Sequence, residues 1–141
     1  MKVFLDANIL VTVLCNEYPR FGECARVLSL ADDDRFQVYT SPLCLAIGAY
    51  FAEKKASRKV VREKIALLAG KLRLTTMDAT SVERTLADKR IVDLEDGFQY
   101  HSALQAGCTN MVTYDIKDYH FARIEVLDPM DFLLKYAVKE R

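Results

Sequence analysis

Short apolar segments alternate with helix-length segments along the whole chain, and this alternation limits the folds that the chain can adopt. The strand-like segments are residues 2–5, 36–40, 72–76, 110–114 and 124–127. Apolar residues at helical spacing fill the stretches between them, at 7–15, 21–31, 42–55, 58–69, 79–88 and 93–107, and Pro129 begins a closing helix. Strands separated by helices form βαβ units, which build a parallel sheet covered on both faces. We therefore predict a single α/β domain over residues 1–141, a three-layer α/β/α sandwich with a five-stranded, mostly parallel sheet.

The composition excludes several classes of protein. Hydrophobic residues make up 51% of the chain, enough for a sizeable core, and the net charge is zero, so a polyanion has to be held by a local patch. No apolar run approaches the ~18 residues of a membrane helix. Asp6 and Asn8 interrupt the first apolar stretch, which argues against a signal peptide. The four scattered cysteines are typical of reduced thiols, so we expect a cytoplasmic protein without membrane contact.

Acidic side chains follow the strands that a doubly wound sheet places side by side. Asp6 comes directly after the first strand, and Asp115 and Asp118 follow the fourth. Asp96, with Glu95 beside it, opens the helix that leads into the fourth strand. Functional groups collect at the carboxyl ends of parallel strands, where several carboxylates repel each other unless a cation lies between them. Because Mg²⁺ prefers oxygen ligands, the pattern predicts a magnesium site at this edge of the sheet.

Each acid also has a purely structural interpretation. Asp6 can cap the N-terminus of the first helix, and Asp93 with Asp96 resembles a capping box. Asp115 and Asp118 can be turn residues of the loop after the fourth strand. The shared placement of these acids at strand ends favours a site over a set of unrelated structural roles.

These residues resemble the PIN-domain family of metal-dependent nucleases over nearly the whole chain. The resemblance rests on the order and spacing of three segments: "VFLDANIL", "EDGFQYHSALQAG" and "MVTYDIKDY". The metal ligands that it implies for Mg²⁺ or Mn²⁺ are Asp6, Asp96 and Asp115. It also implies a further catalytic acid and two polar helpers, which are Asp118, Asn8 and Thr113.

The resemblance carries an expected activity and expected partners. The family implies hydrolysis of RNA by metal-activated water. A compact domain of this kind is similar to the VapC-type toxins of prokaryotic toxin–antitoxin pairs, which act on RNA and are silenced by a small antitoxin protein. A homodimer is a further expectation from the resemblance.

One position departs from the family pattern. The family usually carries a glutamate early in the helix after the second strand, and this chain has Ile47 there. Glu53 lies six residues further on, which is ~600° of rotation and ~9 Å of rise, so it does not replace that ligand. Glu95 is the nearest acid in sequence that can compensate, although it also suits the first turn of a helix. We expect weaker metal binding, or a single well-held ion.

Residues 53–73 form the most basic part of the chain, with eight Lys or Arg and two Glu. Phosphate contacts do not depend on base sequence, so this segment can follow an RNA backbone. The candidate contacts in it are Lys54, Lys55, Arg58, Lys59 and Arg62, and Lys117 lies between the two loop acids. An ordinary solvated helix face is an equally good interpretation of the segment.

Other functions remain as alternatives. A PIN scaffold that has lost catalysis and kept RNA or protein binding fits the departure at Ile47. Phosphoryl-transfer enzymes of the haloacid dehalogenase type need D-x-D after the first strand, where this chain has "DAN", and receiver domains need paired acids and a late lysine. The sequence therefore disfavours these two classes.

Overall fold

The protein folds around one fully parallel sheet. The structure is a computed structural model that describes residues 1–138. Its strands are β1 (Lys2–Leu5), β2 (Gln37–Thr40), β3 (Arg73–Leu74), β4 (Asn110–Val112) and β5 (Glu125–Leu127). They lie in the order β3-β2-β1-β4-β5, and every neighbouring pair is parallel. The predicted sheet and the predicted contact between the first and fourth strands are therefore confirmed.

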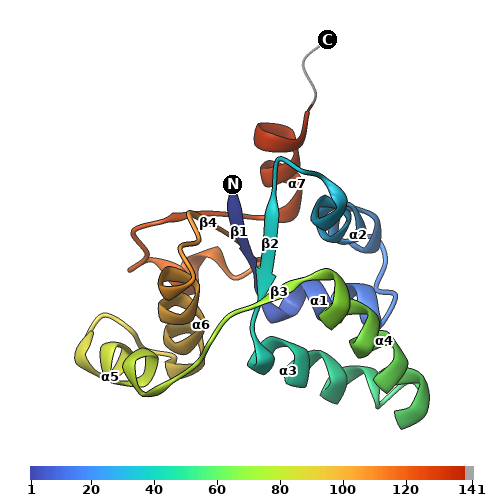
Figure 1. Cartoon of the computed structure of the whole chain (residues 1–141), viewed down its shortest axis with the longest axis horizontal. Helices are drawn as coiled ribbons and strands as arrows, with labels where there is room; N and C mark the ends of the chain where they lie inside the picture. The colour runs from blue at the N-terminus through green and yellow to red at the C-terminus, as the bar shows by residue number, and fades with distance from the viewer. Residues whose placement is uncertain (139–141) are drawn as a thin grey trace.

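Helices cover both faces of the sheet, as the βαβ pattern predicts (Figure 1). One layer contains α1 (Ala7–Leu14), α2 (Phe21–Ser29), α3 (Pro42–Ala52) and α4 (Arg58–Lys71), and α7 (Pro129–Phe132) packs against α2. The other layer contains α5 (Ala79–Ala87) and α6 (Leu94–Gln105), which pack against each other. Short helical turns complete the chain at Leu30–Asp32, Ile116–Tyr119 and Leu133–Ala137.

The core lies on both sides of the central strands. Val3, Phe4 and Leu5 of β1 and Met111 and Val112 of β4 are almost completely buried. Apolar residues on both faces of a strand are expected for a parallel sheet between two helical layers, because neither face meets water. The buried strands β1 and β4 therefore end inside the protein, and the polar residues that follow them, Asp6 and Thr113, are buried as well.

Two predicted elements differ in length from the observed ones. Only Arg73 and Leu74 pair with β2, whereas the sequence predicts a strand over residues 72–76. Leu72 caps α4, so the chain leaves the helix only one residue before β3. Helix α4 continues through Gly70 to Lys71, since Gly70 does not adopt the positive φ of a glycine that ends a helix.

No helix among residues 1–138 is long and apolar enough to cross a membrane. The four cysteines are free, and three of them are buried.

Candidate functional site

The carboxyl ends of β1 and β4 bring together the acids that lie far apart in the sequence. Leu5 pairs with Val112, and the backbone N–H of Asp6 donates to the Val112 carbonyl at 3.1 Å. The two chains diverge just beyond this pair. Asp6 begins α1, and residues 113–115 turn across the end of the sheet.

Asp6 is held by three hydrogen bonds in a nearly dry position. It is 6% exposed and caps α1 by accepting from the Ala7 N–H at 2.8 Å, so its structural interpretation is correct as well. Its other oxygen, Oδ2, accepts from Thr113 Oγ1 at 2.9 Å and from the Tyr119 hydroxyl at 3.1 Å. Burial raises the pKa of Asp6 and outweighs the hydrogen bonds, which lower it.

Asp96 faces Asp6 across the same tyrosine. Its Oδ1 lies 3.3 Å from the Tyr119 hydroxyl, and its buried Oδ2 has no hydrogen-bond partner among the described residues. Burial, followed by the charges of Asp93, Asp6 and Asp118, raises the pKa of Asp96 to about 7. Asp93 caps α6 by accepting from the Glu95 and Asp96 N–H groups, but no reciprocal bond from Asp96 forms a full capping box.

Asn8 and Thr113 position the third acid. Asn8 Nδ2 donates to Asp115 Oδ2 and to Thr113 Oγ1, both at 3.0 Å, and Asn8 Oδ1 accepts from the Tyr114 N–H at 3.3 Å. Thr113 Oγ1 also accepts from the Asp115 N–H at 3.0 Å while it donates to Asp6. These two side chains therefore tie the exposed carboxylate of Asp115 to the buried carboxylate of Asp6.

The three acids open into a cleft of about 390 Å³ between α1, α3, α6 and the loop after β4. Side chains that line it, besides the three acids, include Asn8, Glu17, Arg20, Ile47, Phe51, Glu95 and Tyr114. Ile47 thus lies in the acid cleft. Glu53 is exposed, lies 3.9 Å from Arg58 and does not line the cleft, so the structure agrees that it does not replace a ligand at position 47.

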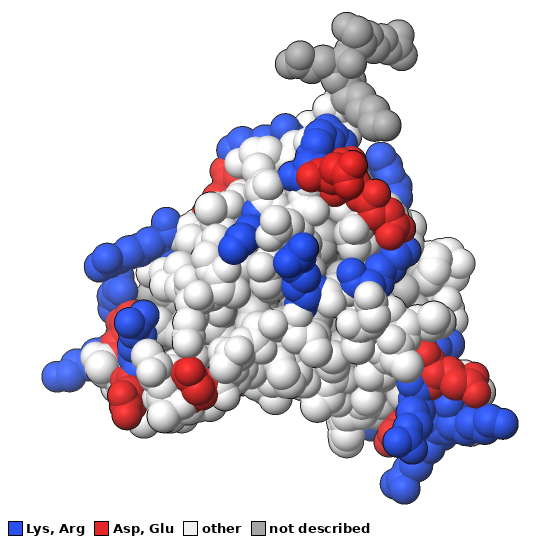
Figure 2. Space-filling model, viewed as in Figure 1, with Lys and Arg blue, Asp and Glu red and all other residues white. Residues whose placement is uncertain are grey.

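Asp118 and the basic candidates lie outside this cleft. Asp118 is exposed on the helical turn after Asp115, where its charge still helps to raise the pKa of Asp96. Lys117 is exposed beside it. The candidate contacts Lys54, Lys55, Arg58, Lys59 and Arg62 are exposed where α3 ends and α4 begins, and Figure 2 shows Lys and Arg gathered at this corner, at the lower right. In that group, Lys54 lies over the Tyr50 ring at 4.5 Å and the Phe51 ring at 5.1 Å.

Two residues of the site are not identified from the sequence. Tyr119 is part of the motif only as an aromatic residue, and nothing in the pattern shows that its hydroxyl bridges two carboxylates. Arg20 lines the cleft with its guanidinium 4.1 Å from the Tyr114 ring centroid, although it belongs to the break between two helices. A positive charge beside clustered acids is a detectable signal, but its position depends on how that break folds.

The donor set suits a hard divalent cation. All the candidate ligands are carboxylate oxygens, and Asp96 presents a buried oxygen without a partner in the described chain. No three His, Cys, Asp or Glu side chains of residues 1–138 are arranged as a complete ligand group, and the Tyr119 hydroxyl bonds both Asp6 and Asp96. Mg²⁺ keeps several waters and is usually held by one or two carboxylates, so the residues present fit that ion.

The metal-free protein should lose stability as the pH rises. An unfolded Asp titrates near 3.9, whereas the folded pKa of Asp96 is raised to about 7. The folded state therefore holds an extra proton between these values, and the free energy of unfolding falls as the pH increases through about 7. Thermal unfolding in EDTA between about pH 5 and pH 8 measures this slope. It should be smaller in Asp96→Asn, and equal slopes in the two proteins would contradict the assignment.

The chain is similar to known proteins over most of its length. A family model described as "PIN domain" matches residues 2–117. The curated protein Ribonuclease VapC1 of Aquifex aeolicus (strain VF5) is 26% identical over 135 residues, which cover 93% of this chain and 92% of that protein.

Solved structures share the fold at lower identity. VapBC2 from Rickettsia felis, bound to a DNA fragment from its promoter, aligns with a TM-score of 0.67 and 17% identity over 91% of this chain and 98% of that one. VapBC-1 from nontypeable Haemophilus influenzae aligns with a TM-score of 0.69 and 16% identity over 92% of this chain and 99% of that one. Mycobacterium tuberculosis VapC20 is described as a sarcin–ricin loop cleaving toxin. It aligns with a TM-score of 0.65 and 17% identity over 87% of this chain and 98% of that one.

Proposed function

The chain belongs to the PIN domain family, and from this premise we propose that it is a Mg²⁺- or Mn²⁺-dependent endoribonuclease, the toxin of a toxin–antitoxin pair. The observation that carries the proposal is the pair of carboxylates of Asp6 and Asp96, which meet at one hydroxyl and leave a buried oxygen of Asp96 without a partner among the described residues. Such a concentration of negative charge is costly unless a cation binds it.

The polar side chains in and beside the cleft would have distinct tasks in this mechanism. Asp6, Asp96 and Asp115 would hold the cation, which would supply a water of lowered pKa and positive charge for the phosphate oxygens. Asn8 and Thr113 fix Asp115 relative to Asp6, and Tyr119 sets the separation of Asp6 and Asp96. Asp118 adds negative charge that reaches Asp96, and Glu95, the residue before Asp96, adds negative charge at the wall of the cleft.

The substrate is RNA, bound through its phosphates. Arg20 supplies a cation at the wall of the cleft. Contacts from Lys54, Lys55, Arg58, Lys59, Arg62 and Lys117 extend the binding surface beyond the acids. The similarity to Ribonuclease VapC1 and to a toxin named for cleaving the sarcin–ricin loop supports this substrate class.

A small antitoxin is the proposed partner, because the solved structures of similar fold include toxin–antitoxin complexes. We also propose that the toxin works in the cytoplasm and forms a homodimer, as the resemblance of the sequence implies.

Metal removal tests the proposal. RNA cleavage should occur in Mg²⁺ or Mn²⁺, stop in EDTA and return when excess Mn²⁺ is added, because the carboxylates alone supply no positive charge to the phosphate. Calorimetric titration of the apoprotein with Mn²⁺ provides a readout that does not depend on activity. Metal binding without cleavage, or no binding at millimolar Mn²⁺, favours the alternative of a PIN scaffold that binds RNA or protein.

Ile47→Glu should strengthen metal binding. The side chain at position 47 lines the cleft with Asp6 and Asp96, so a carboxylate there adds a ligand charge to the same site. We expect the Kd for Mn²⁺ to fall by about tenfold, measured by calorimetry. Ile47→Gln is the matched control, since it has the same length and no charge. Equal affinities of the two variants would show that position 47 does not reach the ion.

A further inference from the structure

A second cavity, lined by several basic residues, borders α6 and shares no lining residue with the acid cleft. It measures about 600 Å³ and is bounded by α5, α6, the loop between them and the loop before β5. Four cationic side chains line it, and Asp88 is the acid among its lining residues. We call this cavity, lined by Arg84, Lys89, Arg90 and Arg123, the basic pocket. Figure 2 shows Lys and Arg with a few acids along this edge, at the left over α5.

The cations of the basic pocket come from three separate segments and are partly fixed in place. Asp88 accepts from Arg90 Nε at 3.0 Å and from Nη2 at 2.8 Å, which orients the guanidinium and leaves its other N–H donors available. The Arg123 N–H donates to the Tyr100 hydroxyl at 2.9 Å, which holds the loop before β5 against α6. A solvated helix face does not require such convergence.

His101 lines the same pocket with both ring nitrogens unused. Nδ1 and Nε2 are buried and have no hydrogen-bond partner in the described part of the chain. A neutral imidazole carries one donor and one acceptor, and buried polar groups are normally paired. Burial lowers the pKa of His101 and outweighs the charge of Asp88, which raises it, while Arg84 lowers it slightly further. Negative charge bound among the cations of the pocket would act against that effect, because a nearby anion favours the imidazolium.

The positive charge in the pocket exceeds what the protein itself neutralises. Arg90 is paired with Asp88, whereas Arg84, Lys89 and Arg123 take part in none of the ion pairs seen within residues 1–138. Guanidinium groups match the paired oxygens of a phosphate, which a protein contacts without reading bases.

We propose that the basic pocket binds the phosphodiester backbone of the RNA substrate, at a point separate from the acid cleft. This inference rests on the proposed ribonuclease function. Asp96 and His101 are five residues apart on α6, which places them ~7.5 Å apart along the helix axis. A single RNA strand can therefore cross α6 and contact the basic pocket while another of its phosphates lies at the acids.

Binding of a short single-stranded RNA in EDTA tests the basic pocket without cleavage. Fluorescence anisotropy over a series of salt concentrations gives the affinity and its salt slope for Arg84→Gln/Arg123→Gln. We expect about a tenfold loss of affinity and a slope smaller by about 1.4, since single strands lose ~0.7 per phosphate contact.

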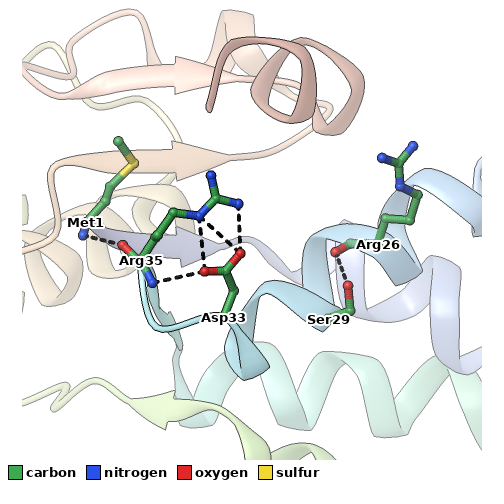
Figure 3. Close-up of polar contacts among 5 residues, drawn as sticks. All are labelled: Met1, Arg26, Ser29, Asp33 and Arg35. Carbon is green, nitrogen blue, oxygen red and sulfur yellow. Dashed lines mark hydrogen bonds and ion pairs between the residues drawn. The ribbon is translucent and has the colours of Figure 1, made fainter. Parts of the chain in front are cut away.

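The matched control removes two exposed charges elsewhere, in Arg26→Gln/Arg35→Gln, at positions that line neither the acid cleft nor the basic pocket and lie outside segment 53–73. The Arg26 guanidinium points away from its neighbours, and only its backbone carbonyl bonds Ser29 (Figure 3). This control should bind RNA within about twofold of the unaltered protein. Equal losses in the two double variants would overturn the proposal, because they would reflect net charge alone.

The imidazole resonances of His101 provide a test in the unaltered protein. Titration by NMR should show the pKa of His101 rising when RNA is added. A response to inorganic phosphate with none to RNA would overturn RNA as the ligand class, and no response to RNA would overturn the site. RNA binding that needs the basic pocket, in a protein that never cleaves RNA, would reject the ribonuclease function and leave the pocket as an RNA site.

Discussion

Asp96→Asn should reduce RNA cleavage by about 10³-fold, equivalent to about 4 kcal/mol of transition-state stabilisation, without unfolding the protein. The substitution keeps the shape of the side chain and the hydrogen bond from Tyr119, but it removes the charge that faces the cation. Asp6→Asn should have the same effect, because its carboxylate lies on the other side of Tyr119. Initial rates of RNA cleavage in saturating Mn²⁺ measure the loss.

The control for charge removal is Asp34→Asn, an exposed acid in the turn before β2. It should retain full activity. Thermal unfolding of all three variants in the same buffer separates a catalytic loss from a folding defect. Unchanged cleavage in both Asp6→Asn and Asp96→Asn would reject these residues as catalytic acids.

Gly97→Ala should lower the free energy of unfolding by about 2–3 kcal/mol. A Cβ at position 97 would lie 2.3 Å from Thr85 Cγ2 and 2.8 Å from Ile91 Cγ2. Thr85 is buried and its hydroxyl donates to the Ser81 carbonyl at 2.8 Å, so it does not rotate away cheaply. The higher helix propensity of Ala offsets only up to ~1 kcal/mol. Urea denaturation measures the difference.

Gly70→Ala is the control for Gly97→Ala. Gly70 lies in helix α4, and a Cβ there meets nothing within 4 Å. Only the higher helix propensity of Ala then matters, and we expect the free energy of unfolding to rise by about 0.5–1 kcal/mol. If Gly97→Ala were as stable as Gly70→Ala, α5 and α6 would not be packed as closely as the structure shows.

Much of the fold can be predicted from the sequence because the signals for helices and strands lie within short segments of the chain. Apolar residues recur at different spacings in the strand and helix segments. Ser41 and Ser57 cap α3 and α4, as their places directly before these helices predict. The contact of β1 with β4 then follows from the doubly wound order. The length of β3 does not follow, because it depends on where α4 releases the chain.

The site is predictable only in part. Asp6 and Asp115 follow β1 and β4 in the sequence, and the pairing of these two strands is enough to bring the two acids to the same end of the sheet. The Tyr119 hydroxyl, the Arg20 guanidinium and the unpaired His101 ring depend on loop conformations and on contacts across two layers. Such contacts leave no periodic signal in a single sequence.

The central position of β1 has a consequence for the order in which the protein is made. Its partner β4 lies more than a hundred residues later in the chain, so the ribosome must translate most of the message before that edge of β1 is covered. Until then Asp6 has neither Thr113 nor Tyr119 to hold it. If the chain is the ribonuclease proposed above, an unfinished polypeptide would carry no assembled acid site and would not cut RNA until synthesis is nearly complete.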